Sequence, residues 1–115
     1  MESIDQSVLD QLGENMGGEG AVARIVAMYL GKLPGEADGL HRSANSPDLE
    51  KLGEDAHRLK SSTAMLGATG LAVILAELEA AAKTGDTGAV AGLLGRFDDE
   101  KAKVERDLSS VATEP

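Results

Sequence analysis

The chain contains only two aromatic residues, Tyr29 and Phe97, among its 115 residues. Because hydrophobic residues still make up 42% of the sequence, a continuous core has to be built from Leu, Val, Ile, Ala and Met. This mixture suits helices better than sheets, since strands favour aromatic and β-branched side chains. The sequence therefore predicts an all-α protein, and its length fits a single domain.

Apolar residues recur at three- and four-residue spacing along most of the chain, as in helices with one buried face. Pro34 lies inside this pattern, and because the pattern resumes in phase after it, we expect a kinked helix there rather than two helices. Glycines and capping residues interrupt the pattern elsewhere. These signals predict five helices: about 4–16, from Gly20 to a boundary at 45–48, from there to Leu66, about 70–84, and from Asp86 to about Val111.

Several of these helices begin with recognisable capping residues. Ser3 together with Gln6 resembles a capping box for the first helix. Ser46 is expected to cap the third helix, with Pro47 at its first position, where proline is well tolerated. Asp86 is the expected cap of the fifth helix.

The connections between the predicted helices are short, so neighbouring helices should run antiparallel. We therefore expect an antiparallel up-down four-helix bundle with an additional short N-terminal helix, in one domain spanning 1–115. The bundle core is expected at about 20–111, whereas 1–19 forms the N-terminal helix and a glycine-rich connector. The glycines at 17–20 are not followed by the Gly-Lys-Ser/Thr of a phosphate-binding loop, so they are interpreted as a plain connector.

The formal net charge of −9 makes nucleic acid and anionic membranes poor candidates for partners. The chain has no cysteine, which excludes disulfides and thiolate metal sites and is consistent with a reducing compartment. The acidic N-terminus does not resemble a signal peptide, and no segment has the ~20 apolar residues of a membrane span. We expect a monomer in the cytoplasm.

His57 is the main candidate for chemistry. At about 100° per residue, it falls roughly 125° from the centre of the apolar stripe of the third helix and should face solvent. The neighbours on its face are Gly53, Lys60, Ser61 and Ala64, of which three are small enough to let a partner approach. The segment 56–76 contains no Asp or Glu, so we expect an imidazole without nearby carboxylates on a surface that is uncharged at its centre.

Other interpretations of the histidines are weaker. His41 is interpreted as a surface or boundary residue. Glu54 and His57 have the Glu-x-x-His spacing of di-iron bundles, but they point away from the core in which such ligands must meet. Ser61 lies within reach of His57, yet no carboxylate is expected to orient the imidazole as in a serine hydrolase. A metal site and hydrolase chemistry are therefore not predicted.

The segments around His57 resemble the histidine-containing phosphotransfer (HPt) domain of multistep two-component phosphorelays. The resemblance extends over most of the chain. It rests on the stretch from Tyr29 to Leu40 with its internal proline, on Ala56-His57-Arg58-Leu59-Lys60-Ser61-Ser62, and on Leu66-Gly67-Ala68, Leu71 and Leu78-Glu79. Members of this family usually carry glycine directly after the lysine, where this chain has Ser61.

The resemblance implies that His57 is the phosphoacceptor and that Lys60 supports it electrostatically. It implies receiver domains of a hybrid sensor kinase or a response regulator as partners, which would supply Mg²⁺ themselves, so no cofactor is expected on this chain. Gly53, Arg58, Ser61 and Ala64 are the expected docking residues. Kinase activity with ATP is not expected. The alternative is a helical adaptor in which His57 is never phosphorylated, and less favoured still is a di-metal carboxylate bundle.

Overall fold

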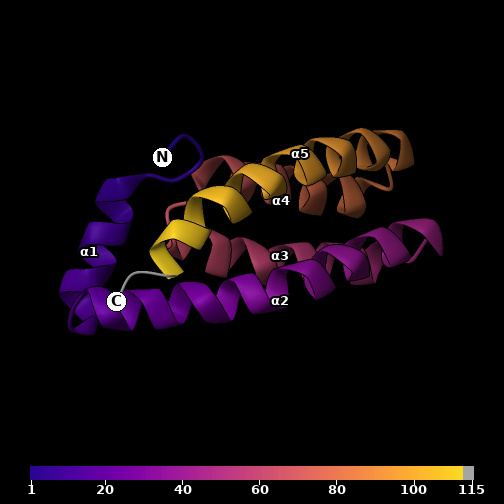
Figure 1. Ribbon diagram of the computed structural model, residues 1–115. Coiled ribbons are helices and arrows are strands. Elements are labelled where there is room, and N and C mark those ends of the chain that lie inside the picture. The colour runs from indigo at the N-terminus through magenta and orange to yellow at the C-terminus, as the bar shows by residue number, and fades with distance from the viewer. Residues whose placement is uncertain (113–115) are drawn as a thin grey trace.

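The computed structural model describes residues 1–112, and this part of the chain contains five α-helices and no strand (Figure 1). The helices are α1 (Gln6–Met16), α2 (Glu19–Asn45), α3 (Leu49–Met65), α4 (Thr69–Thr84) and α5 (Thr87–Ala112). The all-α prediction is confirmed, and each expected helix forms within a few residues of its predicted bounds. Residues 113–115 of the predicted domain lie outside the described residues.

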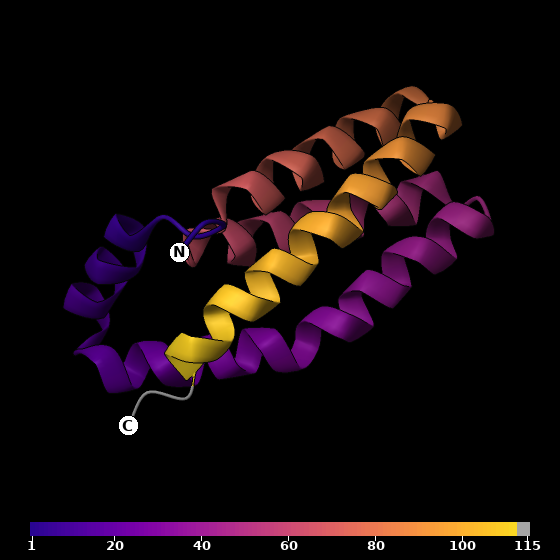
Figure 2. The ribbon, with the colours of Figure 1, turned by 45° about the horizontal axis from the view of Figure 1, so that its top comes forward.

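Helices α2, α3, α4 and α5 run side by side, each antiparallel to the next (Figures 1 and 2). The ring is closed because α5 packs against both α4 and α2, while α3 packs against both α2 and α4. Helix α1 lies across one end of the bundle, where it contacts α2 and α3. The predicted four-helix bundle with an additional N-terminal helix is therefore confirmed. Among residues 1–112, no helix combines the length and the apolarity needed to span a membrane.

Both aromatic residues are buried in the core. The side chain of Phe97 is completely buried on α5, and Tyr29 on α2 is almost so. The Tyr29 hydroxyl lies 2.7 Å from the hydroxyl of Thr63 on α3, so that each satisfies the other inside the core. Burial raises the pKa of Tyr29 to about 12, although the hydrogen bond with Thr63 acts in the opposite direction. This bond joins α2 to the helix that carries His57.

The prediction that Ser3 caps the first helix is wrong. The cap is Asp5, whose carboxylate accepts a hydrogen bond of 3.0 Å from the backbone N–H of Ser7. Ser3 instead donates from both its backbone N–H and its hydroxyl to Asp107 on α5, at 2.9 and 2.7 Å. A capping motif is a local signal, and here a bond across the fold takes the serine away from the helix end.

Gly67 holds the N-terminal segment against the start of α4. The backbone N–H of Asp5 donates to the Gly67 carbonyl at 2.8 Å. Gly67 has φ of +82°, and a Cβ at this position would lie 2.7 Å from the Asp5 carbonyl oxygen. Only glycine fits here without displacing backbone, which agrees with its predicted role in ending the third helix.

The boundary before α3 falls where predicted, but its cap differs. Asp48 caps α3, its carboxylate accepting from the Lys51 N–H at 3.1 Å. Ser46 is instead the C-cap of α2, and its backbone N–H donates to the Arg42 carbonyl. Helix α2 runs unbroken through Pro34 and changes direction near its middle (Figure 2), in line with the predicted kink. Asp86 caps α5 as predicted, accepting from the Ala89 N–H at 3.0 Å.

Candidate functional site

His57 lies on the outer face of α3. Its helix buries Leu52, Ala56, Leu59 and Thr63 against the rest of the bundle, as the apolar stripe predicts. The His57 side chain is on the opposite side and is 63% exposed. The predicted outward position of this imidazole is confirmed. A mid-helix histidine in this position is held by a rigid element while its ring remains open to solvent.

The prediction that no carboxylate lies near His57 is wrong. Glu79, on the neighbouring helix α4, places its Oε2 atom 3.0 Å from His57 Nδ1. The acid-free segment of the sequence covers α3 and the start of α4, but the antiparallel packing of the two helices brings the middle of α4 beside the imidazole. Because Glu79 binds Nδ1, the imidazole nitrogen that it leaves unoccupied is Nε2.

Two lysines share the Glu79 carboxylate with His57. Lys60 donates to Glu79 Oε1 at 3.0 Å, and Lys83 lies 3.4 Å from Oε2, the oxygen that also contacts the imidazole. Only 14% of the Glu79 side chain is exposed. The hydrogen bond from Lys60 is the largest cause that lowers the pKa of Glu79 to about 2; removal from water opposes it, and contacts with His57 and Lys83 add to it. This carboxylate is therefore ionised throughout the physiological range.

An open cleft of about 560 Å³ adjoins the imidazole between α3 and α4. Leu49 and Gly53 line it from α3, and Ala82 and Lys83 line it from α4. Its charged lining also includes Glu50 and Glu54 besides Glu79. The site thus combines an accessible imidazole, a fixed carboxylate on one ring nitrogen and two ammonium groups nearby. Such a set can support nucleophilic attack by the other ring nitrogen.

The predicted docking residues differ in how exposed they are to solvent. Ser61 and Ala64 are exposed on the same face as His57. Gly53 is half-buried against α4, where an added Cβ would lie 3.5 Å from the Ala82 Cβ. Gly53 therefore faces the neighbouring helix more than an incoming partner. Ser61 and Ala64 are the small residues that leave the surface beside the imidazole open.

Arg58 is exposed, but its charge is shared with two carboxylates. Its guanidinium lies 2.9 Å from Asp55 and 3.6 Å from Glu36 of α2. Among residues 1–112, Asp55 is the one charged residue that is buried, and Lys51 binds its other oxygen at 3.0 Å. Burial raises the pKa of Asp55, but the hydrogen bonds from Lys51 and Arg58 outweigh it and lower the pKa overall. The apolar periodicity of α3 gave no sign that Asp55 is buried.

The second histidine, His41, is a surface residue as predicted. Its Nε2 atom lies 2.9 Å from the Asp98 carboxylate of α5, which is half exposed. Within residues 1–112, no group of three or more histidines and carboxylates is placed to hold a metal ion. Glu54, the residue that suggested a metal motif, is exposed, and His57 faces Glu79.

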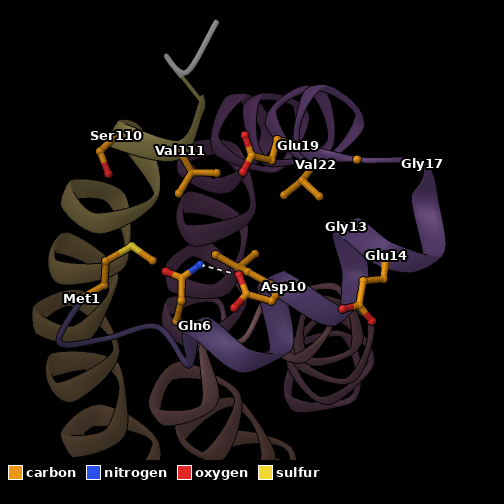
Figure 3. Close-up of a pocket in the computed structure, with 12 residues that line it drawn as sticks. Met1, Gln6, Asp10, Gly13, Glu14, Gly17, Glu19, Val22, Ser110 and Val111 are labelled. Atoms are coloured by element: carbon orange, nitrogen blue, oxygen red, sulfur yellow. Dashed lines mark hydrogen bonds between the residues drawn. The ribbon is translucent and has the colours of Figure 1, made fainter.

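Another cleft, of about 770 Å³, lies at the α1 end of the bundle, and His57 is not among the residues that line it (Figure 3). Gln6 and Asp10 of α1 are joined by a hydrogen bond of 3.0 Å on one side of it, and Val111 of α5 lies across from them. Met1 and Val22 add apolar surface. The residues that line this cleft include neither a histidine nor a lysine or arginine, so it lacks the side chains that accompany His57 on the α3–α4 face.

Comparison with known proteins gives a consistent result. The Hpt domain model matches residues 24–110, a range that includes His57, Lys60 and Glu79. The chain is similar to the phosphorelay protein LuxU of Vibrio cholerae, with 36% identity over 85 residues that make up 74% of each chain. Its structure is similar to the crystal structure of histidine-containing phosphotransfer protein B (HptB) from Pseudomonas aeruginosa. The TM-score is 0.88 at 25% identity, covering 94% of this chain and 92% of that one.

Proposed function

The chain belongs to the Hpt domain family and is a histidine phosphotransfer protein of two-component phosphorelays, and we propose that His57 is the residue that carries its phosphoryl group. The observation that carries the proposal is the contact between His57 Nδ1 and Glu79 Oε2 at 3.0 Å on an otherwise exposed ring. It leaves Nε2 as the nitrogen available to attack phosphorus. His41 has the opposite arrangement, since Asp98 contacts its Nε2.

In the proposed reaction, the lone pair of His57 Nε2 attacks the phosphorus of an aspartyl phosphate on a partner receiver domain. A nitrogen–phosphorus bond forms as the bond between phosphorus and the aspartyl oxygen breaks, and the aspartyl carboxylate leaves with the electron pair. The proton on Nδ1 stays in place, so the phosphorylated ring becomes cationic. The Glu79 carboxylate supports this state because it contacts Nδ1 and is ionised. The reverse reaction returns the phosphoryl group to a receiver.

Lys60 is proposed to neutralise part of the charge on the phosphoryl oxygens. Its ammonium is 3.0 Å from Glu79 Oε1, one helical turn from His57 on α3. We propose that this chain holds no cofactor of its own and that any Mg²⁺ needed belongs to the receiver. We propose further that the chain carries phosphoryl groups without transferring them from ATP itself.

Phosphorelay proteins of this family interact with receiver domains, and the proposed docking surface is the exposed face of α3 around His57. Ser61 and Ala64 have small side chains that do not block access to the imidazole, so that an aspartyl phosphate can reach Nε2 in line. Met28 of α2 and Met65 of α3 are large exposed hydrophobic residues that line one groove between these helices, beside Arg58. Exposed methionines of this kind suit a partner surface. We propose that a receiver of a hybrid kinase or a response regulator docks here on a monomer in the cytoplasm.

The test is incubation of the full chain with a phosphorylated receiver domain, followed by assay of the phosphate that it acquires. We expect acid-labile, base-stable phosphate on the wild-type chain and none on the His57→Gln variant. Absence of uptake by the wild type from any receiver offered, together with partner binding that survives His57→Ala, would favour the adaptor alternative.

A further inference from the structure

Lys83 lies beside His57 but belongs to a different helix from Lys60. It is on α4, one turn beyond Glu79, and its ammonium lies 3.4 Å from the Glu79 oxygen that also contacts His57. Because α3 and α4 are antiparallel, Lys60 lies toward the C-terminus of α3 from the imidazole, and Lys83 lies toward the N-terminal half of that helix. The two lysines thus flank the imidazole along the bundle axis.

The charge around the cleft explains why a second cation matters. Lys60 and Glu79 form a pair whose charges cancel, so this pair alone offers no net positive charge to an incoming phosphoryl group. The charged residues that line the cleft beside the imidazole are Glu50, Glu54, Glu79 and Lys83. Without Lys83, the charged side chains of that lining would all be carboxylates, and a dianionic phosphoryl group would be repelled.

Lys83 is also free to move toward such a group. Its side chain is 73% exposed and is held by one contact of 3.4 Å, longer than the 3.0 Å contact that Lys60 makes. A lysine has a flexible four-carbon stem, so its ammonium can leave Glu79 and still remain near the imidazole. Glu79 keeps Lys60 and His57 as partners when Lys83 moves away.

We propose that Lys83 is a second phosphoryl-binding residue, which contacts the phosphoryl group on the α4 side of His57. This inference rests on the proposed function of His57. It assigns the ammonium of Lys83 to the phosphoryl oxygens themselves and not to the surface of the partner protein.

Two phosphoryl donors distinguish contact with the phosphoryl group from contact with the surface of the partner protein. A phosphorylated receiver domain has to dock before it transfers its phosphoryl group. Phosphoramidate is a small donor that needs no docking surface; histidine displaces ammonia from it as the nitrogen–phosphorus bond to the protein forms. Lys83→Gln is expected to slow phosphorylation from both donors by about three- to fivefold, the range expected for one screened surface charge. Lys83→Arg should retain most of the rate, and the deficit of Lys83→Gln should shrink at high salt.

Lys103→Gln is the matched control. Lys103 is a lysine of α5 whose side chain is 44% exposed and makes similarly loose ion pairs, at 3.5 Å with Glu2 and 3.9 Å with Glu100, away from His57. Its replacement should leave both rates unchanged. If Lys83→Gln slows transfer from the receiver but not from phosphoramidate, Lys83 contacts the partner and the proposal is wrong. Equal rates for Lys83→Gln and the control would also overturn it, whereas a wild-type chain that accepts no phosphate from either donor would instead refute the function of His57.

Discussion

Two histidine–carboxylate pairs lie on different faces of this bundle, and only one has the surroundings of a phosphorylation site. His57 and Glu79 join α3 to α4 at 3.0 Å, whereas His41 and Asp98 join α2 to α5 at 2.9 Å. The distances are almost equal, so the pair by itself does not distinguish the two sites.

The difference lies in the carboxylate and in the nitrogen that it occupies. Glu79 is largely buried and is bound by two lysines, whereas half of the Asp98 side chain is exposed. Glu79 contacts Nδ1 of a ring that is mostly exposed, but Asp98 contacts Nε2 of His41, whose side chain is 41% exposed. If His57 is the phosphoacceptor as proposed, the comparison teaches that such a histidine is distinguished by a carboxylate bound by lysines and by an open Nε2, not by a neighbouring acid alone.

The strongest way to break this comparison is to remove each histidine in turn. His57→Gln should abolish phosphate uptake from a phosphorylated receiver, since the proposed nucleophile is lost. His41→Gln should accept phosphate at the wild-type rate. Circular dichroism should report the same helical content for both variants, because both side chains lie outside the core. Uptake that is lost in His41→Gln and retained in His57→Gln would reverse the assignment.

A bulky residue beside His57 should produce the next largest effect. Ala64→Trp is expected to slow transfer from a receiver by up to about a hundredfold, because displacing the reacting atoms by about 1 Å can cost that much. Thermal unfolding should barely change, since Ala64 is exposed. Asp99→Trp, at an exposed position of α5, is the silent control. Gly53→Trp is less suitable because Gly53 is half-buried beside Ala82 of α4, so a large side chain there would also meet the neighbouring helix. A normal transfer rate for Ala64→Trp would show that receivers approach from another side.

Replacing Glu79 and Asp98 in turn tests the difference between the two histidine–carboxylate pairs more sharply. Glu79→Gln keeps a hydrogen-bonding side chain but removes the charge that supports the phosphorylated ring. We expect transfer to slow by about tenfold, equivalent to losing roughly 1.4 kcal/mol of a charge-assisted hydrogen bond. Asp98→Asn should leave the rate unchanged. If both variants transfer phosphate at the wild-type rate, the contact of Glu79 with His57 Nδ1 has no functional consequence.

The same carboxylate makes a prediction about acid stability. The pKa of Glu79 is lowered from 4.5 to about 2 in the folded chain, chiefly by Lys60. A depressed pKa contributes stability above the unfolded value, and this contribution is lost as the pH falls from about 4.5 toward 2. Urea unfolding at several pH values should therefore show a smaller loss of stability on acidification for Glu79→Gln than for the wild type. An identical pH dependence would contradict the ion pairs assigned to Glu79.

Lys60→Ala should have the smallest of these effects. It is expected to slow transfer by about three- to fivefold without abolishing it, because a single partly exposed charge is screened by water. The rate of phosphotransfer at low ionic strength is the appropriate measurement, since salt weakens such contributions. A wild-type rate in this variant would make Lys60 a structural partner of Glu79 only.

The sequence predicts features that depend on one helix and misses those that depend on two. The position of His57 follows from the apolar stripe of its own helix, and the bundle follows from five such stripes with short connections. Glu79 was visible only as part of a family resemblance, because the register between α3 and α4 cannot be deduced from either helix alone. Its spacing of four residues from Lys83 was the one local sign of an ion pair.

The capping errors have a similar origin. Ser3 and Ser46 have the residue types of N-caps, but Asp5 and Asp48 occupy those positions in the structure. Ser3 binds Asp107 from the opposite end of the chain. Backbone N–H and hydroxyl groups of Ser3 lower the pKa of Asp107 to about 2, with a smaller contribution from Arg106. For Ser3 a bond across the fold decides against the local propensity, whereas Ser46 is held at the end of α2 by local bonds to Arg42 and Ser43.

The most direct measurement identifies the nitrogen that carries phosphorus. NMR spectra of the chain with ¹⁵N-labelled histidine, recorded before and after phosphorylation, resolve the two ring nitrogens of each imidazole. We predict coupling to ³¹P at Nε2 of His57, a proton retained on its Nδ1 beside Glu79, and unchanged signals from His41. Phosphorus on His41, or on Nδ1 of His57, would contradict the role that the structure suggests for the Glu79 contact.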